Sequence, residues 1–321
     1  IPSVQQDIQQ GTNTIKAQPL QSIEDLRHLL NTLAKQGFGP SSICALELAA
    51  LDLLMKSKGI QLAPFFKLPP IPDISYSLIL PLLAPEKLSG LLQKITHFQA
   101  PKIKIKVNYD QVANLERIRI LRRHLGEQIP IRVDVNGGWS LKEALTYIPE
   151  LMALGVRSFE QILPVAQKAD WAQVNRTFGG EVRIMADESL TSIQDAQALI
   201  EQGCCNHFNL KISKLGGLFR SQAIYQLAQK HGISCQLGAH FGETNILATA
   251  GVVLASLCPE LTAYEGAMSD FLLEKDLGQP STRHGVDGRL SVQKALDKVG
   301  WFEQIDLDDI DQQFTTAKYL L

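Results

Sequence analysis

The sequence predicts an α/β protein: a modified (β/α)8 barrel of the TIM type with a smaller α+β capping domain. Short apolar or β-branched runs alternate with helical patterns from Ser75 onward, which is typical of repeated strand–helix units in a parallel sheet. These runs end about every 24 to 28 residues, the length that a strand, two loops and a crossover helix require. Two amphipathic helical patterns precede Ser75 and stand outside the alternation, which predicts a separate capping domain.

Eight runs qualify as barrel strands, and eight strand–helix units are the number that closes such a barrel. The runs span residues 76–80, 103–107, 131–135, 157–161, 182–187, 207–211, 234–237 and 262–265. Between them, residues 111–125 and 216–230 carry apolar side chains at helical spacing. Ser140, just before Leu141 and Glu143, is predicted to cap the start of a further helix.

The parts outside the alternation define the domain organisation. The helical patterns at 23–35 and 41–58 place residues 1–72 in the N-terminal part of the capping domain. Residues 73–286 are the barrel catalytic domain, and residues 287–321 are expected to return to the cap. The linker between cap and barrel is marked by Pro64, Pro69, Pro70 and Pro72. Because the chain starts at Ile1 rather than Met, a truncated N-terminal part is one interpretation.

Composition narrows the classes of function. With 321 residues, 45% of them hydrophobic and 20% charged, the chain can bury a large core, which excludes global disorder. A net charge of −2 gives no basic footprint, so we expect a small-molecule substrate and no nucleic acid. No apolar run is long enough for a membrane span, so no membrane partner is expected. The cysteines are odd in number and lack C-x-x-C spacing, which favours a reducing cytoplasm; they are Cys44, Cys204, Cys205, Cys235 and Cys258.

Polar residues end most of the predicted strands, at the edge where barrel enzymes place their chemistry. Asp134, Glu160 and Asp187 end three successive strands, and three hard oxygen ligands with open positions suit Mg²⁺. A single acid at a strand end is more often a helix cap or a solvated loop residue. Three acids in phase on consecutive strands favour the metal site.

Lysines end two other strands. Lys104 and Lys106 lie two residues apart, so both face the interior of the predicted barrel. An amine that is partly buried beside other cations has a lowered proton affinity, as a general base needs. The alternative is an edge strand with a solvated lysine face, which Lys102 would also fit. Lys211 favours the catalytic interpretation, because it ends a strand on the far side of the same mouth.

Together these residues resemble the motifs of the enolase superfamily, and within it the muconate lactonizing enzyme subgroup, which is mandelate racemase-like in its fold. The resemblance covers about residues 75–276 and lies in the order and spacing of five motifs. They are Lys104-Ile-Lys106, Asp134-Val-Asn136, Phe159-Glu160-Gln161, Asp187-Glu188-Ser189, and Lys211 with Lys214-Leu-Gly-Gly217. Each motif is weak alone, and the ordered set is specific.

The resemblance implies a set of roles. Asp134, Glu160 and Asp187 would be magnesium ligands, and Lys106 and Lys211 the acid/base pair. Lys104 would support the substrate carboxylate. Other polar residues at the same mouth would contact substrate or support these groups: Asn136, Glu188, His240, Glu243 and Glu265. Barrels of this kind often associate, so a homo-oligomer is also compatible with the sequence.

Several features depart from the family pattern. The N-terminal strands that normally carry a specificity loop are not recognisable in residues 1–20. The proline that usually follows E-Q stands three residues later, at Pro164. His240 is similar to a histidine base of the mandelate racemase subgroup, although Lys211 already fills that role and a non-titrating His240 is favoured. The D-x-D of dipeptide epimerases is absent from residues 265–270.

The expected chemistry is therefore abstraction of the α-proton of a carboxylate substrate to give an enolate. The remodelled cap slightly favours a lyase reaction, dehydration as in o-succinylbenzoate synthases, or cycloisomerisation as in muconate cycloisomerases. The alternative is an isomerase, an amino-acid or dipeptide racemase or epimerase. A lysine in a barrel can also form a Schiff base, as in an aldolase. A non-catalytic binding barrel is the remaining alternative.

Overall fold

The computed structural model describes residues 2–18, 20–94, 100–266, 276 and 289–301. Its centre is a parallel sheet of eight strands in sequential order, β2 to β9. The strands are β2 (Leu78–Leu80), β3 (Ile103–Lys106), β4 (Ile131–Asp134), β5 (Val156–Glu160), β6 (Arg183–Ala186), β7 (His207–Leu210), β8 (Ser234–Leu237) and β9 (Leu261–Tyr264). The sheet curls until its two edges meet, where the amide of Ser77 donates to the carbonyl of Tyr264 at 2.8 Å. The predicted barrel is confirmed.

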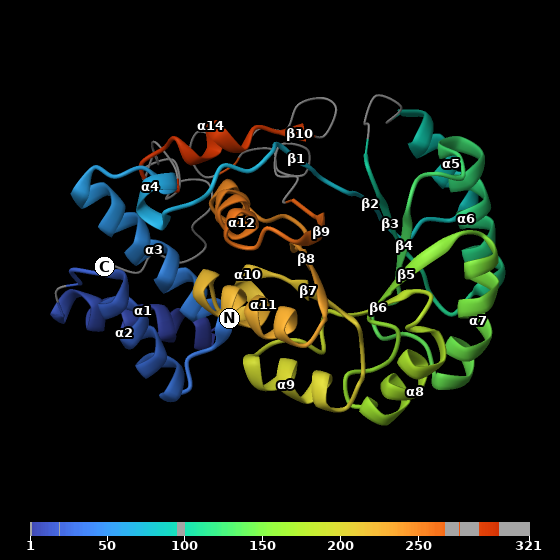
Figure 1. The fold of residues 1–321 in the computed structure, drawn as a ribbon, viewed down its shortest axis with the longest axis horizontal. Coiled ribbons are helices and arrows are strands. Elements are labelled where there is room, and N and C mark those ends of the chain that lie inside the picture. Colours follow the sequence, from blue (N-terminus) through green and yellow to red (C-terminus); the bar gives the residue numbers. More distant parts are fainter. Residues whose placement is uncertain (1, 19, 95–99, 267–275, 277–288, 302–321) are drawn as a thin grey trace.

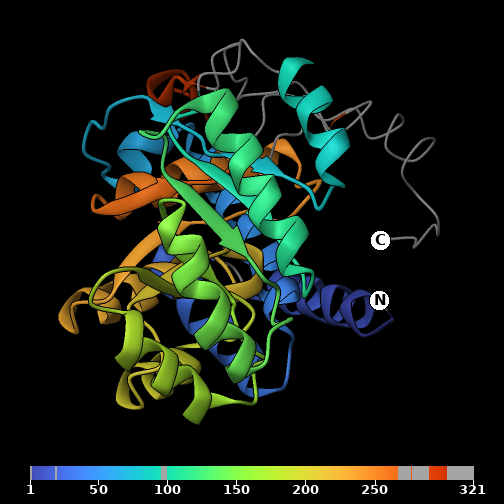
Figure 2. The same ribbon diagram turned by 90° about the vertical axis from the view of Figure 1, so that its right-hand side faces the viewer.

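Among the described residues, helices cover the outside of the curled sheet, with one helix after each of the strands β2 to β6 and β8 and two after β7 (Figures 1 and 2). They are α5 (Pro85–Lys94), α6 (Gln111–Leu125), α7 (Leu141–Ala153), α8 (Lys168–Phe178), α9 (Ile193–Glu201), α10 (Ile212–Leu215) with α11 (Leu218–Lys230), and α12 (Asn245–Leu257). Helix α7 starts as predicted: the Ser140 hydroxyl accepts from the amide of Glu143, and the Glu143 carboxylate accepts from the amide of Ser140. Right-handed strand–helix crossovers of this kind place every strand end on one rim of the barrel.

The N-terminal segment is helical throughout its described part. It comprises α1 (Pro2–Ala17), α2 (Ile23–Lys35), α3 (Pro40–Lys58) and α4 (Leu62–Phe66), which lie together on the left of Figure 1. Helices α2 and α3 match the prediction. Helix α2 begins at a Ser22 cap and buries a stripe of leucines at helical spacing. Helix α1 was not predicted, because its sequence is mostly polar and carries Gly11 in its interior.

The described C-terminal residues return to the N-terminal helices. Strand β10 (Arg289–Leu290) pairs antiparallel with β1 (Ile74–Ser75), and α14 (Val292–Leu296) follows. Beyond α14, the Trp301 indole is buried and donates to the carbonyl of Leu48 in α3 at 2.7 Å. The expected return of residues 287–321 to the cap stays a prediction. The predicted domain boundary at 286 lies outside the described residues and stays a prediction.

A buried carboxylate joins the N-terminal helices to the barrel. Glu47 of α3 accepts hydrogen bonds from the amides of Leu218 at 2.7 Å and Phe219 at 3.2 Å, at the start of α11. Gly217 must be a glycine, because its φ is 108° and a Cβ there would collide with the Glu47 carboxylate. Burial raises the pKa of Glu47 to about 8, against the opposing effect of these two amides.

None of the helices in the described part of the chain has the length and apolar character that a membrane span requires.

Candidate active site

The strand register brings predicted site residues to one level at the carboxyl end of the barrel. Lys106 of β3 lies beside Asp134 of β4, and Asp134 lies beside Glu160 of β5. Lys211 follows β7, four strands away from β3 in the sheet order. In a closed eight-stranded barrel, four strands is half of the circumference, so Lys106 and Lys211 rise from opposite walls.

Lys104 is buried inside the barrel and bonds two carboxylates. Its ammonium donates to Glu265 at 2.8 Å and to Glu160 at 3.3 Å, and Asp134 lies 3.8 Å away. The side chain is 4% exposed, and β3 lies between β2 and β4 in the sheet. The alternative of a solvated lysine face on an edge strand is therefore wrong for Lys104.

A second buried cation, Arg132, completes this network and was not predicted. Its guanidinium pairs with Glu265 and, at 2.9 Å, with Glu160, and it also donates to the side-chain carbonyl of Gln236. The amide of Asn209 donates to Glu160 at 3.0 Å. Arg132 and Asn209 share a signal: Arg132 stands two positions before Asp134, and Asn209 two positions before Lys211, so period-2 alternation turns both inward.

Asp187 is held by two ammonium groups. The Nζ of Lys211 donates to one carboxylate oxygen at 2.6 Å, and the Nζ of Lys214 contacts the other oxygen and the backbone carbonyl of Asp187. Burial alone would raise the pKa of Asp187, but the charges of Lys214 and Lys211 outweigh it and hold that pKa below its usual value. Asp187 is therefore ionised, which a metal ligand needs. The part that Lys214 takes was not predicted.

Asp134 has the opposite electrostatic environment. Burial raises the pKa of Asp134 to about 7, and repulsion by Glu160 adds to the rise. Lys104 and Lys106 oppose it without cancelling it, and Asp187 contributes a smaller repulsion. The three predicted metal ligands therefore lie close enough for their charges to act on one another.

Lys106 lies at the open side of the carboxylate cluster formed by Asp134, Glu160 and Asp187, and it begins a short chain of hydrogen bonds. Its Nζ donates to Asn136 Oδ1 at 2.7 Å, and Asn136 Nδ2 donates to Glu188 Oε1 at 2.9 Å. The Lys106 side chain is 43% exposed, so its ammonium stands at the mouth. Asn136 has a φ of 49°, a left-handed conformation that asparagine tolerates better than most residues.

Gln161 joins the loop that follows β5 to the loop that follows β6 through side-chain hydrogen bonds. Its side-chain carbonyl accepts from the amides of Asp187 at 3.0 Å and Ser189 at 3.1 Å, and its Nε2 donates to the Ser189 hydroxyl at 2.7 Å. These bonds hold Gln161 at a φ of 41°, which is strained for this residue type. The backbone next to Glu160 is therefore held by the hydrogen bonds of Gln161, although the proline stands at Pro164 and not directly after Gln161.

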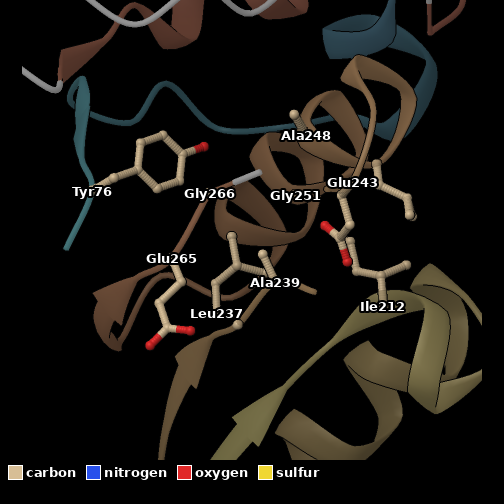
Figure 3. A pocket seen from close by; sticks show the side chains of 11 residues that line it. Tyr76, Ile212, Leu237, Ala239, Glu243, Ala248, Gly251, Glu265 and Gly266 are labelled. Carbon is tan, nitrogen blue, oxygen red and sulfur yellow. The ribbon is translucent and has the colours of Figure 1, made fainter. Parts of the chain in front are cut away.

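His240 and Glu243 lie at the edge of the mouth, after β8. His240 Nδ1 lies 3.0 Å from the Ser213 hydroxyl, and the His240 amide donates to Glu243 at 2.8 Å. Glu243 lines a pocket of about 260 Å³ with Tyr76, and Figure 3 shows the Glu265 carboxylate pointing away from it. The hydrogen-bond partners of His240 in the described ranges are therefore Glu243 of its own loop and Ser213 of α10, not the ligands predicted for the metal.

The chemistry of the donors fits magnesium. Asp134, Glu160 and Asp187 offer buried carboxylate oxygens whose mutual repulsion a divalent cation would relieve. Within the described ranges, no group of three His, Cys, Asp or Glu side chains stands in a ready metal-binding geometry. The ammonium groups of Lys104 and Lys211 contact oxygens of Glu160 and Asp187.

The fold is an eight-stranded barrel in which acids and lysines converge at the carboxyl ends of the strands. This arrangement is typical of barrel enzymes that have their active site at that end. Residues 90–304 match the family described as Enolase C-terminal domain-like. The chain belongs to this family, in the muconate lactonizing enzyme subgroup of the enolase superfamily, and is an enzyme of that superfamily.

Similar proteins include both epimerases and cycloisomerases. The L-amino acid-D/L-Glu epimerase of Francisella philomiragia is 30% identical over 229 residues, which cover 68% of this chain and 61% of that protein. The chloromuconate cycloisomerase of Cupriavidus pinatubonensis is 31% identical over 229 residues, covering 70% of this chain and 60% of that protein. The match thus spans about three-fifths of each relative's length.

A solved structure agrees with the fold. The dipeptide epimerase from Cytophaga hutchinsonii, complexed with Mg and the dipeptide D-Ala-L-Val, superposes with a TM-score of 0.80 at 24% identity. The superposition covers 90% of this chain and 77% of that chain. At this identity the likeness supports the fold alone.

Proposed function

We propose that this chain is a Mg²⁺-dependent racemase or epimerase that acts on the carbon between a carboxylate and an acylated nitrogen. The observation that carries the proposal is the position of Lys106 and Lys211 on opposite walls of one carboxylate-lined mouth. Inversion at a carbon requires one group to remove the proton from one face and another to return a proton to the other face. Two lysines across a mouth meet this requirement.

Each side chain has a distinct part in the proposed reaction. Lys106 and Lys211 exchange the proton, one acting as base and the other, protonated, as acid. Lys104 contacts the buried carboxylates of Glu160 and Glu265 and helps to hold them in place. Asn136 holds the Lys106 ammonium at 2.7 Å, which orients it toward the mouth.

Three carboxylates would hold the metal. Asp134, Glu160 and Asp187 would bind Mg²⁺, which supplies positive charge to the substrate carboxylate as negative charge develops on it. Arg132 and Asn209 fix the Glu160 carboxylate from below, so its orientation does not depend on solvent. The backbone of Asp187 is held by its amide, which donates to the side-chain carbonyl of Gln161 in the neighbouring loop.

Epimerisation is preferred to the dehydration that the remodelled cap slightly favoured. The similar proteins named above act, by their names, as epimerases and a cycloisomerase, and they give no specific support to o-succinylbenzoate synthesis. Dipeptides and N-acyl amino acids share the acylated nitrogen, so both belong to the proposed substrate class. The absent D-x-D favours the N-acyl amino acids; residues 267–270 of that segment lie outside the described residues.

The test is a screen for magnesium-dependent inversion. Single enantiomers of N-acyl amino acids and dipeptides, with muconate and the o-succinylbenzoate precursor alongside, are incubated with the chain and Mg²⁺ and followed by chiral chromatography. We expect inversion of an acylated substrate that Lys106→Ala and Lys211→Ala each lower by about 10³-fold or more, since each general acid or base contributes at this scale. Lys142→Ala, an exposed lysine on α7, is the matched control.

Other outcomes separate the alternatives. Turnover of muconate or of the o-succinylbenzoate precursor, without inversion of any acylated substrate, would replace the proposal by a cycloisomerase or a lyase. A substrate-dependent adduct on either lysine after borohydride treatment would support a Schiff-base aldolase instead.

A further inference from the structure

A second polar cavity lies at the opposite end of the barrel. Its empty space, open solvent included, is about 420 Å³, and it lies among residues that begin the strands. Arg183 is the first residue of β6 and His207 the first of β7, while Lys102 directly precedes β3. This end carries none of the residues assigned to the proposed reaction except Arg132, whose side chain lies between the two ends.

The cavity is lined by cations without acids. Lys102, Arg157 and Arg183 line it, and none of the lining residues in the described ranges is an aspartate or glutamate. Lys102 donates to the carbonyl of Thr262, and Arg157 donates to the carbonyl of Met152 at 2.7 Å. Within the described residues, these three cations form no ion pair with a carboxylate.

The charges act on one another across the cavity. Burial lowers the pKa of Lys102, and the nearby charges of Arg183 and Arg132 lower it further. The buried imidazole of His207 has a pKa well below its usual value, through burial first and then the charges of Arg183, Arg132 and Lys102. The electrostatic balance at this end therefore lacks a negative charge.

A buried hydroxyl points to where that charge would sit. Ser158 is 9% exposed, lines the cavity, and has no hydrogen-bond partner for its Oγ among the described residues. In the sheet register, Ser158 lies between Arg132 of β4 and Arg183 of β6. A buried hydroxyl donor in a pocket that arginine side chains also line suits an oxygen-rich anion.

We propose that this cavity binds a small oxyanion of the phosphate type, with Arg183, Lys102 and Ser158 as its main contacts. Guanidinium and hydroxyl donors match phosphate oxygens, and a doubly charged anion would offset the clustered cations. The bound anion stabilises the amino end of the barrel, because a ligand that binds the folded state alone opposes unfolding. The proposal is independent of the reaction proposed above.

The experiment measures binding of inorganic phosphate to the full chain by isothermal titration calorimetry, at constant ionic strength in chloride buffer. We expect one saturable site that Arg183→Gln weakens about tenfold, the scale of one charge-assisted contact, and Ser158→Ala weakens less. Arg183 is exposed, so its replacement leaves the fold intact. Arg176→Gln, an exposed arginine on α8 that is absent from the cavity lining, should leave the affinity within about twofold.

Two further results decide the location. Lys106→Ala should retain phosphate binding, since Lys106 lies at the other end of the barrel. Absence of a saturable site, equal affinity in the wild type and Arg183→Gln, or loss of binding in Lys106→Ala would each overturn the proposal.

Discussion

The two ends of this barrel carry the same types of cation with opposite electrostatic outcomes. At the carboxyl end, Lys104 and Lys211 each contact a buried carboxylate. At the amino end, Lys102 and Arg183 line a cavity without any acid. Position along the strand, rather than residue type, decides which cations are neutralised by the protein itself.

The difference in ion pairing between the two ends suits one end to binding a metal and the other to binding an anion. Paired cations hold carboxylates in a dry interior, where those carboxylates can bind a metal and sit beside a lysine base. Unpaired cations around a cavity leave positive charge for an anion from solution.

Removal of divalent metal has the largest expected effect and concerns the carboxyl end alone. Chelation by EDTA should lower turnover by about 10³-fold or more, since charge stabilisation by a metal contributes several kcal/mol to the rate. Added Mg²⁺ should restore it. The measurement is the inversion rate before and after dialysis, and undiminished turnover in EDTA contradicts the assigned metal ligands.

Replacement of one arginine at each end compares the two ends directly. Arg132→Met leaves Glu160 and Glu265 with less compensation and should lower the free energy of unfolding by about 3–5 kcal/mol. Arg183→Met, measured in chloride without phosphate, should leave it unchanged or raise it, because an unpaired cation is removed. Denaturant unfolding of both variants gives the comparison, and equal losses would contradict it.

Glu47 differs from Glu160 and Glu265. It is a buried carboxylate that forms no ion pair with any lysine or arginine in the described ranges. The folded-state pKa is raised to about 8, so the protonated form contributes stability that is complete below the unfolded pKa and is lost as pH rises. The free energy of unfolding should therefore fall between about pH 5 and pH 8, by up to roughly 4 kcal/mol.

Glu47→Gln provides the control for this pH dependence. Glutamine keeps an oxygen for the Leu218 amide and does not titrate, so the variant should flatten the profile in that range. Thermal unfolding at several pH values makes the measurement. A profile with the same slope in wild type and variant would assign the pH dependence to other groups.

The smallest expected effect concerns His240. Its imidazole contacts Ser213 and Glu243 of the same rim, so His240→Ala should change the rate of inversion by less than about tenfold, below the contribution of a general base. A loss as large as that expected for Lys211→Ala would make His240 a participant in proton transfer.

Sequence patterns predicted the barrel strands well, because each buried strand is short, apolar and bounded by turn residues. Strand β8 matches at both ends, and β2 begins two residues later than predicted. Helix α1 was missed, because its polar residues give no clear apolar stripe and its burial depends on contact with α3.

The candidate site shows where sequence patterns stop being informative. Asp134, Glu160 and Lys106 were predicted because each ends a strand, and their register confirms only that they are neighbours. Arg132 and Asn209 lie deeper in the barrel, where polar residues are rare, and only their pairing with Glu160 gives them a role. The unpaired cations near Arg183 depend on distances between strands, which no local pattern contains.

Deuterium exchange shows whether Lys106 and Lys211 act on opposite faces of the reacting carbon. Each enantiomer of an accepted substrate is incubated in D₂O with Mg²⁺, and α-deuterium incorporation is followed by NMR for the wild type, Lys106→Ala and Lys211→Ala. We predict that wild type exchanges both enantiomers, while each variant loses exchange with one enantiomer and keeps it with the other. If both variants retain exchange with both enantiomers, the two lysines do not face the reacting carbon from opposite walls.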